Sequence, residues 1–353
     1  PFFKNSSIRL KDHKVAVPEL LSPKDKKLST QAGFGKLLDH IARQENPISK
    51  RLITICPDVS GTTSLGSWIN RKKLFARNPK RDVFKDSEIP STAKWEAEPS
   101  GQHLELGIAE MNLFIALAAA GLSDSLFGKR LLPIGTLYDP FVCRGLDALN
   151  YACYQDARFM IVGTPSGVTL APEGGAHQSI STPLIGLSQD GIMSFEPAFV
   201  DELSIIMSWG LSFMQQDDGG SIYLRLTTRP LEQPKRQLTD NLKNDVVNGA
   251  YWWREPGPNC ELIIAYQGVV ADQVFSAAGY LAEAKRDVGV LAVTSADRLQ
   301  ADLNKARRKR YTGADSSAIS HIEQKLIKVP RHAVLLTVID GHPATLAWLG
   351  GVY

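Results

Sequence analysis

The sequence lacks the features that mark several specialised classes of protein. Its four cysteines (Cys56, Cys143, Cys153 and Cys260) form no CxxC pair and lie mostly in apolar segments, which argues against a zinc site or a disulfide framework. The longest apolar stretch, residues 113–121, is too short to span a bilayer, and no signal peptide is visible. A net charge of +3 is too small to indicate nucleic-acid binding. We therefore expect an intracellular protein with reduced thiols that binds neither nucleic acid nor membrane.

Common catalytic motifs are absent as well. The sequence contains no GxSxG, Walker A, HExxH or GxGxxG motif, so an unrelated Rossmann-like oxidoreductase is disfavoured. The segment GTPSG (163–167) resembles a nucleophile elbow only superficially, because Pro165 and Ser166 stand in the wrong order. The chemistry of this chain must come from another kind of site.

The pattern that is present is an alternation of apolar strands and helices. Such alternation with short connections predicts an α/β fold with a doubly wound, mainly parallel sheet, and the length of 353 residues suggests about two domains. In the first half we expect strands at 52–58, 131–136, 158–164 and 221–228, and helices at 144–155 and 199–215. In the second half we expect strands at 261–268, 288–295 and 333–340, and helices at 272–286 and 321–328.

Composition shifts divide the chain into four segments. We expect a linker or arm at 1–28, a first domain at 29–228, a linker at 229–245, and a second domain at 246–353 that is truncated, so that its α/β fold is incomplete. Within the first domain, 59–101 reads as a long polar and basic insertion, with Trp68 and Trp95 as its anchors. Its most basic run, RKKLFARNPKR, is interpreted as a solvated loop rather than a binding arm.

Two polar segments stand where the carboxyl ends of parallel strands should lie, which is where such sheets bind ligands. The first contains Glu110, which heads an apolar helix; taken alone, it is explained by the helix dipole, worth about 0.3–1 kcal/mol. The second, APEGGAHQS, contains Glu173 and His177. A loop histidine bonded to backbone is an even alternative for His177, although Gly174 and Gly175 would let a ligand approach the backbone closely.

Several motifs in order resemble the pyrimidine-binding domain of the transketolase superfamily. They are GQHLELGIAEMN, LPIGTLYDPFVCRGLD, QDARFMIVGTPSGVTLAPEGGAHQSIS and FEPAFVDEL, preceded by KLSTQAGFGKLL. Within the superfamily the sequence is most similar to the first, decarboxylating component of the homodimeric bacterial type of pyruvate dehydrogenase. The resemblance continues through NCELIIAYQGVVADQ and DVGVLAVTSADRL into the C-terminal domain of that family, and covers roughly residues 28–350.

The resemblance implies a thiamine diphosphate site. In this superfamily the glutamate that falls on Glu110 hydrogen-bonds the aminopyrimidine ring of the cofactor and promotes loss of the thiazolium proton. The histidine that falls on His177 faces the reacting carbon and handles protons of substrate oxygens. Glu173 matches an acidic position in the same loop and is a third candidate catalytic residue.

The same resemblance supplies further cofactor-binding candidates. Tyr138 and Phe141 are the candidates for stacking on the aminopyrimidine ring, worth about 0.5–1.5 kcal/mol beyond area burial, although two core aromatics would look the same in sequence. Gly174 and Gly175 complete the expected cofactor contacts. Arg144 and Arg158 are interpreted as structural.

The family holds the diphosphate through Mg²⁺ on a separate domain with a GDG…N motif, and this sequence contains no GDG. We therefore expect Mg²⁺ to be held by a domain not in this chain, and no metal ligand within it. The implied partners are a second copy or a diphosphate-binding domain or chain, with Ala118, Ala119 and Ala120 suited to close helix packing. A lipoyl acyltransferase core is a further candidate partner.

The expected activity is decarboxylation of a small 2-oxoacid, with pyruvate favoured, in the cytoplasm or, in a eukaryote, the mitochondrial matrix. Two alternatives stay open. One is a transketolase-like enzyme that transfers a ketol group. The other is a non-catalytic assembly or regulatory relative, which the presence of both Glu110 and His177 disfavours.

Overall fold

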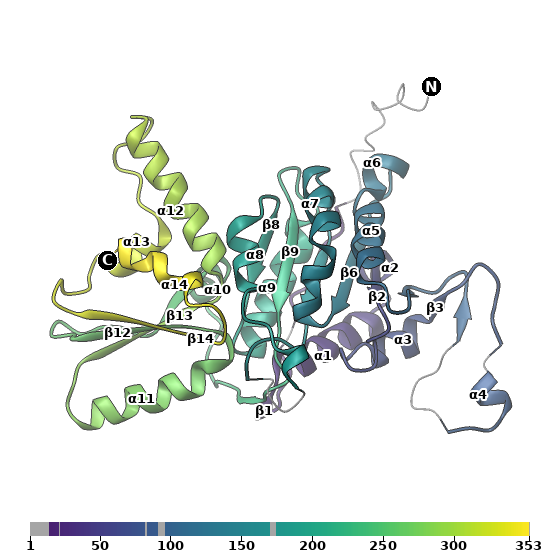
Figure 1. Ribbon diagram of the computed structural model, residues 1–353, viewed down its shortest axis with the longest axis horizontal. Coiled ribbons are helices and arrows are strands. Elements are labelled where there is room, and N and C mark those ends of the chain that lie inside the picture. The colour runs from purple at the N-terminus through teal and green to yellow at the C-terminus, as the bar shows by residue number, and fades with distance from the viewer. Residues whose placement is uncertain (1–13, 21, 82, 91–95, 170–173, 353) are drawn as a thin grey trace.

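A computed structural model describes residues 14–20, 22–81, 83–90, 96–169 and 174–352 of the chain. Figure 1 shows two α/β units side by side, the first built on an eight-stranded sheet and the second on a four-stranded sheet. The predicted α/β class with two units is confirmed. None of the described helices is both long enough and apolar enough to cross a membrane.

The first sheet is parallel throughout and has the strand order β4-β3-β5-β2-β6-β7-β9-β8. Its strands are β2 (Leu52–Cys56), β3 (Leu74–Phe75), β4 (Ala97–Glu98), β5 (His103–Glu105), β6 (Leu132–Leu137), β7 (Met160–Gly163), β8 (Ile192–Phe195) and β9 (Ser221–Arg225). The four strands predicted in this half correspond to β2, β6, β7 and β9. The others escaped prediction because they have only two to four residues each, too few for a periodic signal.

Helices cover both faces of this sheet, as its apolar central strands require. Its helices are α1 (Thr30–Arg43), α2 (Pro47–Arg51), α3 (Gly66–Lys72), α4 (Val83–Asp86), α5 (Glu110–Gly121), α6 (Ser123–Phe127), α7 (Leu146–Tyr154), α8 (Pro183–Ser188) and α9 (Val200–Phe213), with 3₁₀ turns η2 (Asp139–Gly145) and η4 (Gly175–His177). Side chains of β6 and β7 alternate between two cores. Ile134 and Val162 pack on the side of α1 and α9, whereas Leu137 and Ile161 pack on the side of α5 and α7.

The basic insertion at 59–101 adds the strands β3 and β4 to the edge of the first sheet. Trp68 is fully buried and anchors α3, whereas Trp95 lies outside the described residues. The described part of the expected arm lies against the first unit: Leu20 is buried in the main core, and Val15 donates its backbone N–H to Gln215 at 2.8 Å.

The second sheet has the order β11-β13-β12-β14, in which only β11 is antiparallel to its neighbour. The elements after β9 are β10 (Leu231–Glu232), α10 (Asp240–Asn248), β11 (Ala250–Arg254), β12 (Leu262–Gln267), η5 (Gly268–Val270), α11 (Ala271–Glu283), β13 (Val288–Val293), α12 (Ala296–Tyr311), α13 (His321–Leu326), β14 (Val334–Ile339), α14 (Ala344–Ala347) and η6 (Trp348–Gly351). β10 pairs with β1 (Lys27–Leu28). The predicted strands and helices correspond to β12, α11, β13, α13 and β14.

The helices α10 and α12 and the strand β11 were not predicted. β11 is a short strand directly after α10, a helix that begins within the expected linker. α12 is strongly charged and buries only a narrow stripe through Leu299, Leu303 and Ala306, so it carries little apolar periodicity.

The two units share one core. Tyr251, Ile264 and Tyr266 of the second unit belong to the same buried cluster as Phe195 and Phe199 of the first. The carboxyl ends of the two sheets also meet: Gln267 at the end of β12 donates to Glu196 after β8, and Asp340 after β14 accepts the Val168 N–H in the loop after β7.

Candidate functional site

Glu110 is the first residue of α5 and is only 9% exposed. The residue before it, Ala109, offers no side chain to cap the helix. Arg144 reaches the carboxylate from η2, with its Nη1 donating to Oε1 at 2.6 Å. The carboxylate at the head of this apolar helix is therefore buried, and it is accompanied by a guanidinium ion.

An aromatic cluster lies beside this ion pair. The ring of Tyr138 meets that of His177 edge-on with centroids 5.2 Å apart, and Phe141 lies 5.9 Å from each of them. The Arg144 guanidinium sits 3.8 Å above the Phe141 ring, a cation–π contact. Arg144 therefore connects Glu110 to the aromatic cluster.

The chain topology brings the four residues Glu110, Tyr138, Phe141 and His177 together. α5 follows β5, η2 follows β6, and η4 with His177 follows β7, and these strands lie close together in the sheet. All three segments leave the carboxyl ends of parallel strands, the place where such sheets bind ligands. The structure thus gathers Glu110, Tyr138, Phe141 and His177 at one edge.

The remaining predicted residues lie in the loop before His177. Gly174 has φ of 99°, a conformation that favours glycine, and a Cβ on Gly174 or on Gly175 would meet nothing within 4 Å. Both glycines therefore face open space in this structure. Glu173 lies outside the described residues.

Arg144, interpreted as structural, lies within the candidate site, because its guanidinium binds the carboxylate of Glu110 and covers the Phe141 ring. Its position three residues after Phe141 was a signal for the aromatic contact, but nothing in the sequence pointed to Glu110. Arg158 does have the expected structural role: it is buried and donates to the backbone carbonyls of Gln216 and Asp217.

The helices beside the site are not buried all round. α5 buries Leu113, Phe114 and Leu117 against the sheet, but Met111 and Ile115 on its other face are 40% and 55% exposed. α7 covers the same face of the sheet and exposes Tyr151 and Tyr154. The expectation of a buried helix at 113–121 is therefore correct for one side only.

The cysteines also divide by exposure. All four are free; Cys56 and Cys260 are buried, whereas Cys143 on η2 is exposed, which its apolar neighbours in sequence did not predict. Burial raises the pKa of the Cys56 thiol to about 12, so this thiol stays protonated.

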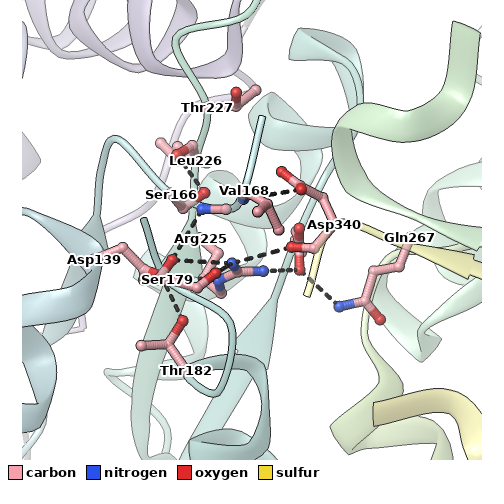
Figure 2. Close-up of polar contacts among 12 residues, drawn as sticks. Asp139, Ser166, Val168, Ser179, Thr182, Arg225, Leu226, Thr227, Gln267 and Asp340 are labelled. Atoms are coloured by element: carbon pink, nitrogen blue, oxygen red, sulfur yellow. Dashed lines mark hydrogen bonds and ion pairs between the residues drawn. The ribbon is translucent and has the colours of Figure 1, made fainter. Parts of the chain in front are cut away.

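A second polar cluster lies at the same edge of the sheet but is buried, and sequence reasoning missed it. Arg225, at the end of β9, donates from Nε to Asp139 at 3.1 Å and from Nη1 to Glu196 at 2.6 Å. Hydroxyls of Ser179, Thr182 and Tyr223 also donate to Asp139. Figure 2 shows how Asp340 and Gln267 of the second unit join this cluster.

Burial shifts the pKa values of two side chains in the buried cluster, Glu196 and Tyr223. Burial raises the pKa of Glu196, and the nearby charge of Asp340 adds to the increase, against the opposing influence of Arg225. Burial next to Asp139 likewise raises the pKa of Tyr223. The phenol of Tyr223 therefore stays a hydrogen-bond donor, and Arg225 stays charged between its carboxylates.

The metal-binding potential of the described residues and two hollows of the chain can be compared with the Glu110 cluster. Among the described residues, no group of three or more His, Cys, Asp or Glu side chains is arranged to hold a metal ion. Two hollows, of about 330 Å³ beside α12 and α13 and about 850 Å³ around Phe199, Arg236 and Trp253, are lined by other residues. The Glu110 cluster is open to solvent on the side of Arg144, whose side chain is half exposed.

The parallel sheet, the second α/β unit and the polar groups at their junction define a transketolase-type fold. Transketolase from Leishmania mexicana superposes with a TM-score of 0.68 at 15% identity, covering 93% of this chain and 40% of that one. A split-gene transketolase chain, described as an inactive β4 tetramer, superposes with a TM-score of 0.59 at 17% identity, covering 92% of this chain and 84% of that one.

Sequence comparison assigns the chain to one family among the proteins with this fold. The family model of the pyruvate dehydrogenase E1 component middle domain matches residues 8–234, and the chain belongs to this family. The pyruvate dehydrogenase E1 component of Corynebacterium glutamicum is 28% identical over 293 residues, which cover 78% of this chain and 31% of that protein. The chain thus spans about a third of the length of such relatives. The pyruvate dehydrogenase E1 and transketolase families use thiamine diphosphate.

Proposed function

We propose that this chain forms the pyrimidine-binding portion of a thiamine diphosphate-dependent enzyme that decarboxylates a 2-oxoacid, with pyruvate favoured. The observation that carries the proposal is the position of Glu110: a nearly buried carboxylate at the head of α5, beside Tyr138, Phe141 and His177. Decarboxylation rather than ketol transfer is favoured by membership in the pyruvate dehydrogenase E1 family.

The residues of the site fit the aminopyrimidine end of the cofactor. A carboxylate can exchange a proton with a ring nitrogen, and Glu110 is sheltered enough from water to do so specifically. Tyr138 and Phe141 offer ring faces and edges for an aromatic ligand. When bound, thiamine diphosphate supplies a nucleophilic carbon that attacks the substrate carbonyl.

Arg144 forms an ion pair with Glu110. The ion pair orients the carboxylate, and Phe141 holds the guanidinium from its other side. His177 is proposed to handle protons of substrate oxygens, because it joins the same cluster from the opposite loop. Glu173 is proposed as a further acid in that loop on the resemblance alone.

Assembly with another polypeptide is part of the proposal. The apolar outward face of α5, with Met111 and Ile115 beside Glu110, is suited to a second copy or to a diphosphate-binding chain. In that arrangement the partner would supply the Mg²⁺ and bind the diphosphate. A lipoyl acyltransferase partner and a cytoplasmic location stay predictions from the resemblance.

Calorimetry with thiamine diphosphate and Mg²⁺ tests where the cofactor is held. We expect this chain alone to bind weakly or not at all, because the described residues offer the ring a site but no anchor for the diphosphate. In the complete enzyme that contains this chain, Glu110→Ala should weaken cofactor binding. Asp240→Asn, an exposed first-turn carboxylate on α10, is the matched control and should change nothing. A dissociation constant of about 1 μM or tighter for the chain alone would contradict this assignment of the anchor.

A further inference from the structure

The loop that carries His177 leaves the first unit after β7 and returns before α8. Its two ends meet at a neck: Ser179 Oγ accepts the Gly167 N–H at 2.9 Å, and the Ser179 N–H donates to the Gly167 carbonyl at 3.3 Å. Ser179 also donates to Asp139 of the buried cluster. The neck therefore belongs to the rigid interior, while His177 lies beyond it.

Residues of the second unit hydrogen-bond to both segments of this neck, the entry side at 167–169 and the exit side at 179–180. On the entry side, Asp340 Oδ1 accepts the backbone N–H of Val168 at 2.9 Å, and Asp340 Oδ2 accepts the Thr169 hydroxyl at 2.7 Å. On the exit side, the His342 N–H donates to the Ile180 carbonyl at 2.8 Å. Figure 2 shows Asp340 reaching Val168 across the junction from the end of β14.

The packing at this contact leaves no room for another arrangement. Asp340 is only 5% exposed, and a Cβ on Gly167 would lie 1.9 Å from its Oδ2. Gly167 also has φ of +87°, which favours glycine. The second unit and the neck of the loop are therefore fitted to each other at a position where only glycine allows the approach.

We propose that Asp340 is a positioning residue: through the neck at 167–169 and 179–180 it sets where His177 stands against Tyr138 and Phe141. The inference rests on the role proposed for His177. It assigns to the second unit a part in building the site. Because a carboxylate accepts up to four hydrogen bonds, it can hold two successive amides and a hydroxyl at once.

Hydrogen exchange measured by mass spectrometry tests the clamp in the unliganded protein. Asp340→Ala should speed exchange of the Val168 and Thr169 amides by about 10- to 100-fold, the factor expected for losing hydrogen bonds to a charged group. Asp340→Asn retains one acceptor oxygen and should give an intermediate increase. Thr169→Val removes only the hydrogen bond from the Thr169 hydroxyl to Asp340 and leaves the second unit unchanged. Of the three variants it should raise exchange of the Val168 and Thr169 amides least.

Asp287→Ala is the matched control. Asp287 also lies in the second unit and accepts a backbone N–H, from Gly257 at 3.1 Å, but far from the loop in the fold. It should leave exchange at 167–180 unchanged. Exchange in β2 and β6 reports global stability in every variant. Unchanged exchange at 168–169 in Asp340→Ala and Asp340→Asn would overturn the inference.

The His177 ring gives a second readout that a purely structural role would not move. Its ring-proton NMR signals, assigned by their loss in His177→Ala, should move in Asp340→Asn because the ring leaves its place against Tyr138. In the complete enzyme, Asp340→Asn should slow substrate-dependent steps as His177→Ala does, but leave exchange of the thiazolium proton intact. If His177→Ala leaves catalysis unchanged while Asp340→Asn loosens the loop and moves the ring signal, the role of His177 fails and the clamp stands. If His177→Ala slows catalysis but the ring signal of Asp340→Asn does not move, the clamp fails and the proposed function stands.

Discussion

Two groups of charged residues lie at the same edge of the first sheet and are built in opposite ways. In the buried cluster, Arg225 is 3% exposed and is held by Asp139 and Glu196. In the candidate site, the Arg144 side chain is 53% exposed and holds the less exposed carboxylate of Glu110. Both groups pair an arginine with a carboxylate, but only the second is accessible to a ligand.

The difference separates a structural ion pair from a site. A buried guanidinium surrounded by carboxylates, hydroxyls and backbone has no bond left to offer, and its removal leaves charges without partners. A half-exposed guanidinium over an aromatic ring can move at a small cost in free energy when a ligand binds the carboxylate. The following variants test this contrast.

Arg225→Met should give the largest effect. It leaves Asp139 and Glu196 buried and facing each other without a cation, which should lower the free energy of unfolding by about 3–5 kcal/mol. Urea denaturation of the purified chain measures it. A loss below about 1 kcal/mol would mean that the buried cluster is as replaceable as a surface pair.

Glu196→Gln should change how stability depends on pH. Burial raises the pKa of Glu196 above its ordinary value of 4.5. The folded state therefore retains a proton that the unfolded chain has released, and stability falls as pH rises from about 4.5 towards the folded-state pKa, by up to about 1.4 kcal/mol per unit.

The glutamine variant lacks this titration, so its stability curve between pH 4 and 8 should be flatter than that of the wild type. Glu105 provides the opposite case: although burial opposes it, hydrogen bonds from His103 and Ser60 lower its pKa, so its contribution is lost as pH falls. Identical pH profiles for the wild type and Glu196→Gln would show that Glu196 is already ionised in the folded state at low pH.

Ile115→Glu should weaken assembly. It places a charge in the outward apolar face of α5, which is proposed to meet another chain, and should raise the dissociation constant at least about tenfold, or 1.4 kcal/mol. Light scattering over a concentration series measures this, with Tyr280→Glu on the exposed face of α11 as the control. Equal association of both variants would place the interface elsewhere.

Arg144→Met should have the smallest effect on stability, below about 1 kcal/mol, because its side chain is half exposed and Glu110 can be hydrated in its place. The same urea measurement as for Arg225→Met gives a direct contrast between the two arginines. If Arg144→Met lowers the free energy of unfolding nearly as much as Arg225→Met does, the half-exposed and the buried ion pairs do not differ in the way proposed.

The sequence predicted the parts of this molecule that have strong local signals. The apolar strands β2, β6, β7 and β9 were found because parallel strands are apolar on both faces. Glu110 and His177 were found because motifs in order resemble a known family, and the structure brings them to one edge.

The buried cluster could not be predicted, because its members come from six separate segments and each has an unremarkable neighbourhood. Arg225 ends a strand that reads as ordinary, and Asp340 follows β14 with more than a hundred residues between them. Only the fold brings such residues together. The contact between Arg144 and Glu110 was missed for a related reason: one arginine on a helical turn carries no sign of the carboxylate that it meets.

The central claim is that Glu110 exchanges a proton with the cofactor ring. The most direct test is NMR-monitored hydrogen–deuterium exchange of the thiazolium proton of thiamine diphosphate bound to the complete enzyme. Glu110→Gln preserves the shape and a hydrogen bond but cannot exchange the proton. We predict that exchange slows by about 10²–10⁴-fold, the usual contribution of a positioned acid–base group, whereas His177→Ala leaves it nearly intact. If Glu110→Gln exchanges the proton as fast as the wild type, Glu110 is only a first-turn residue of α5.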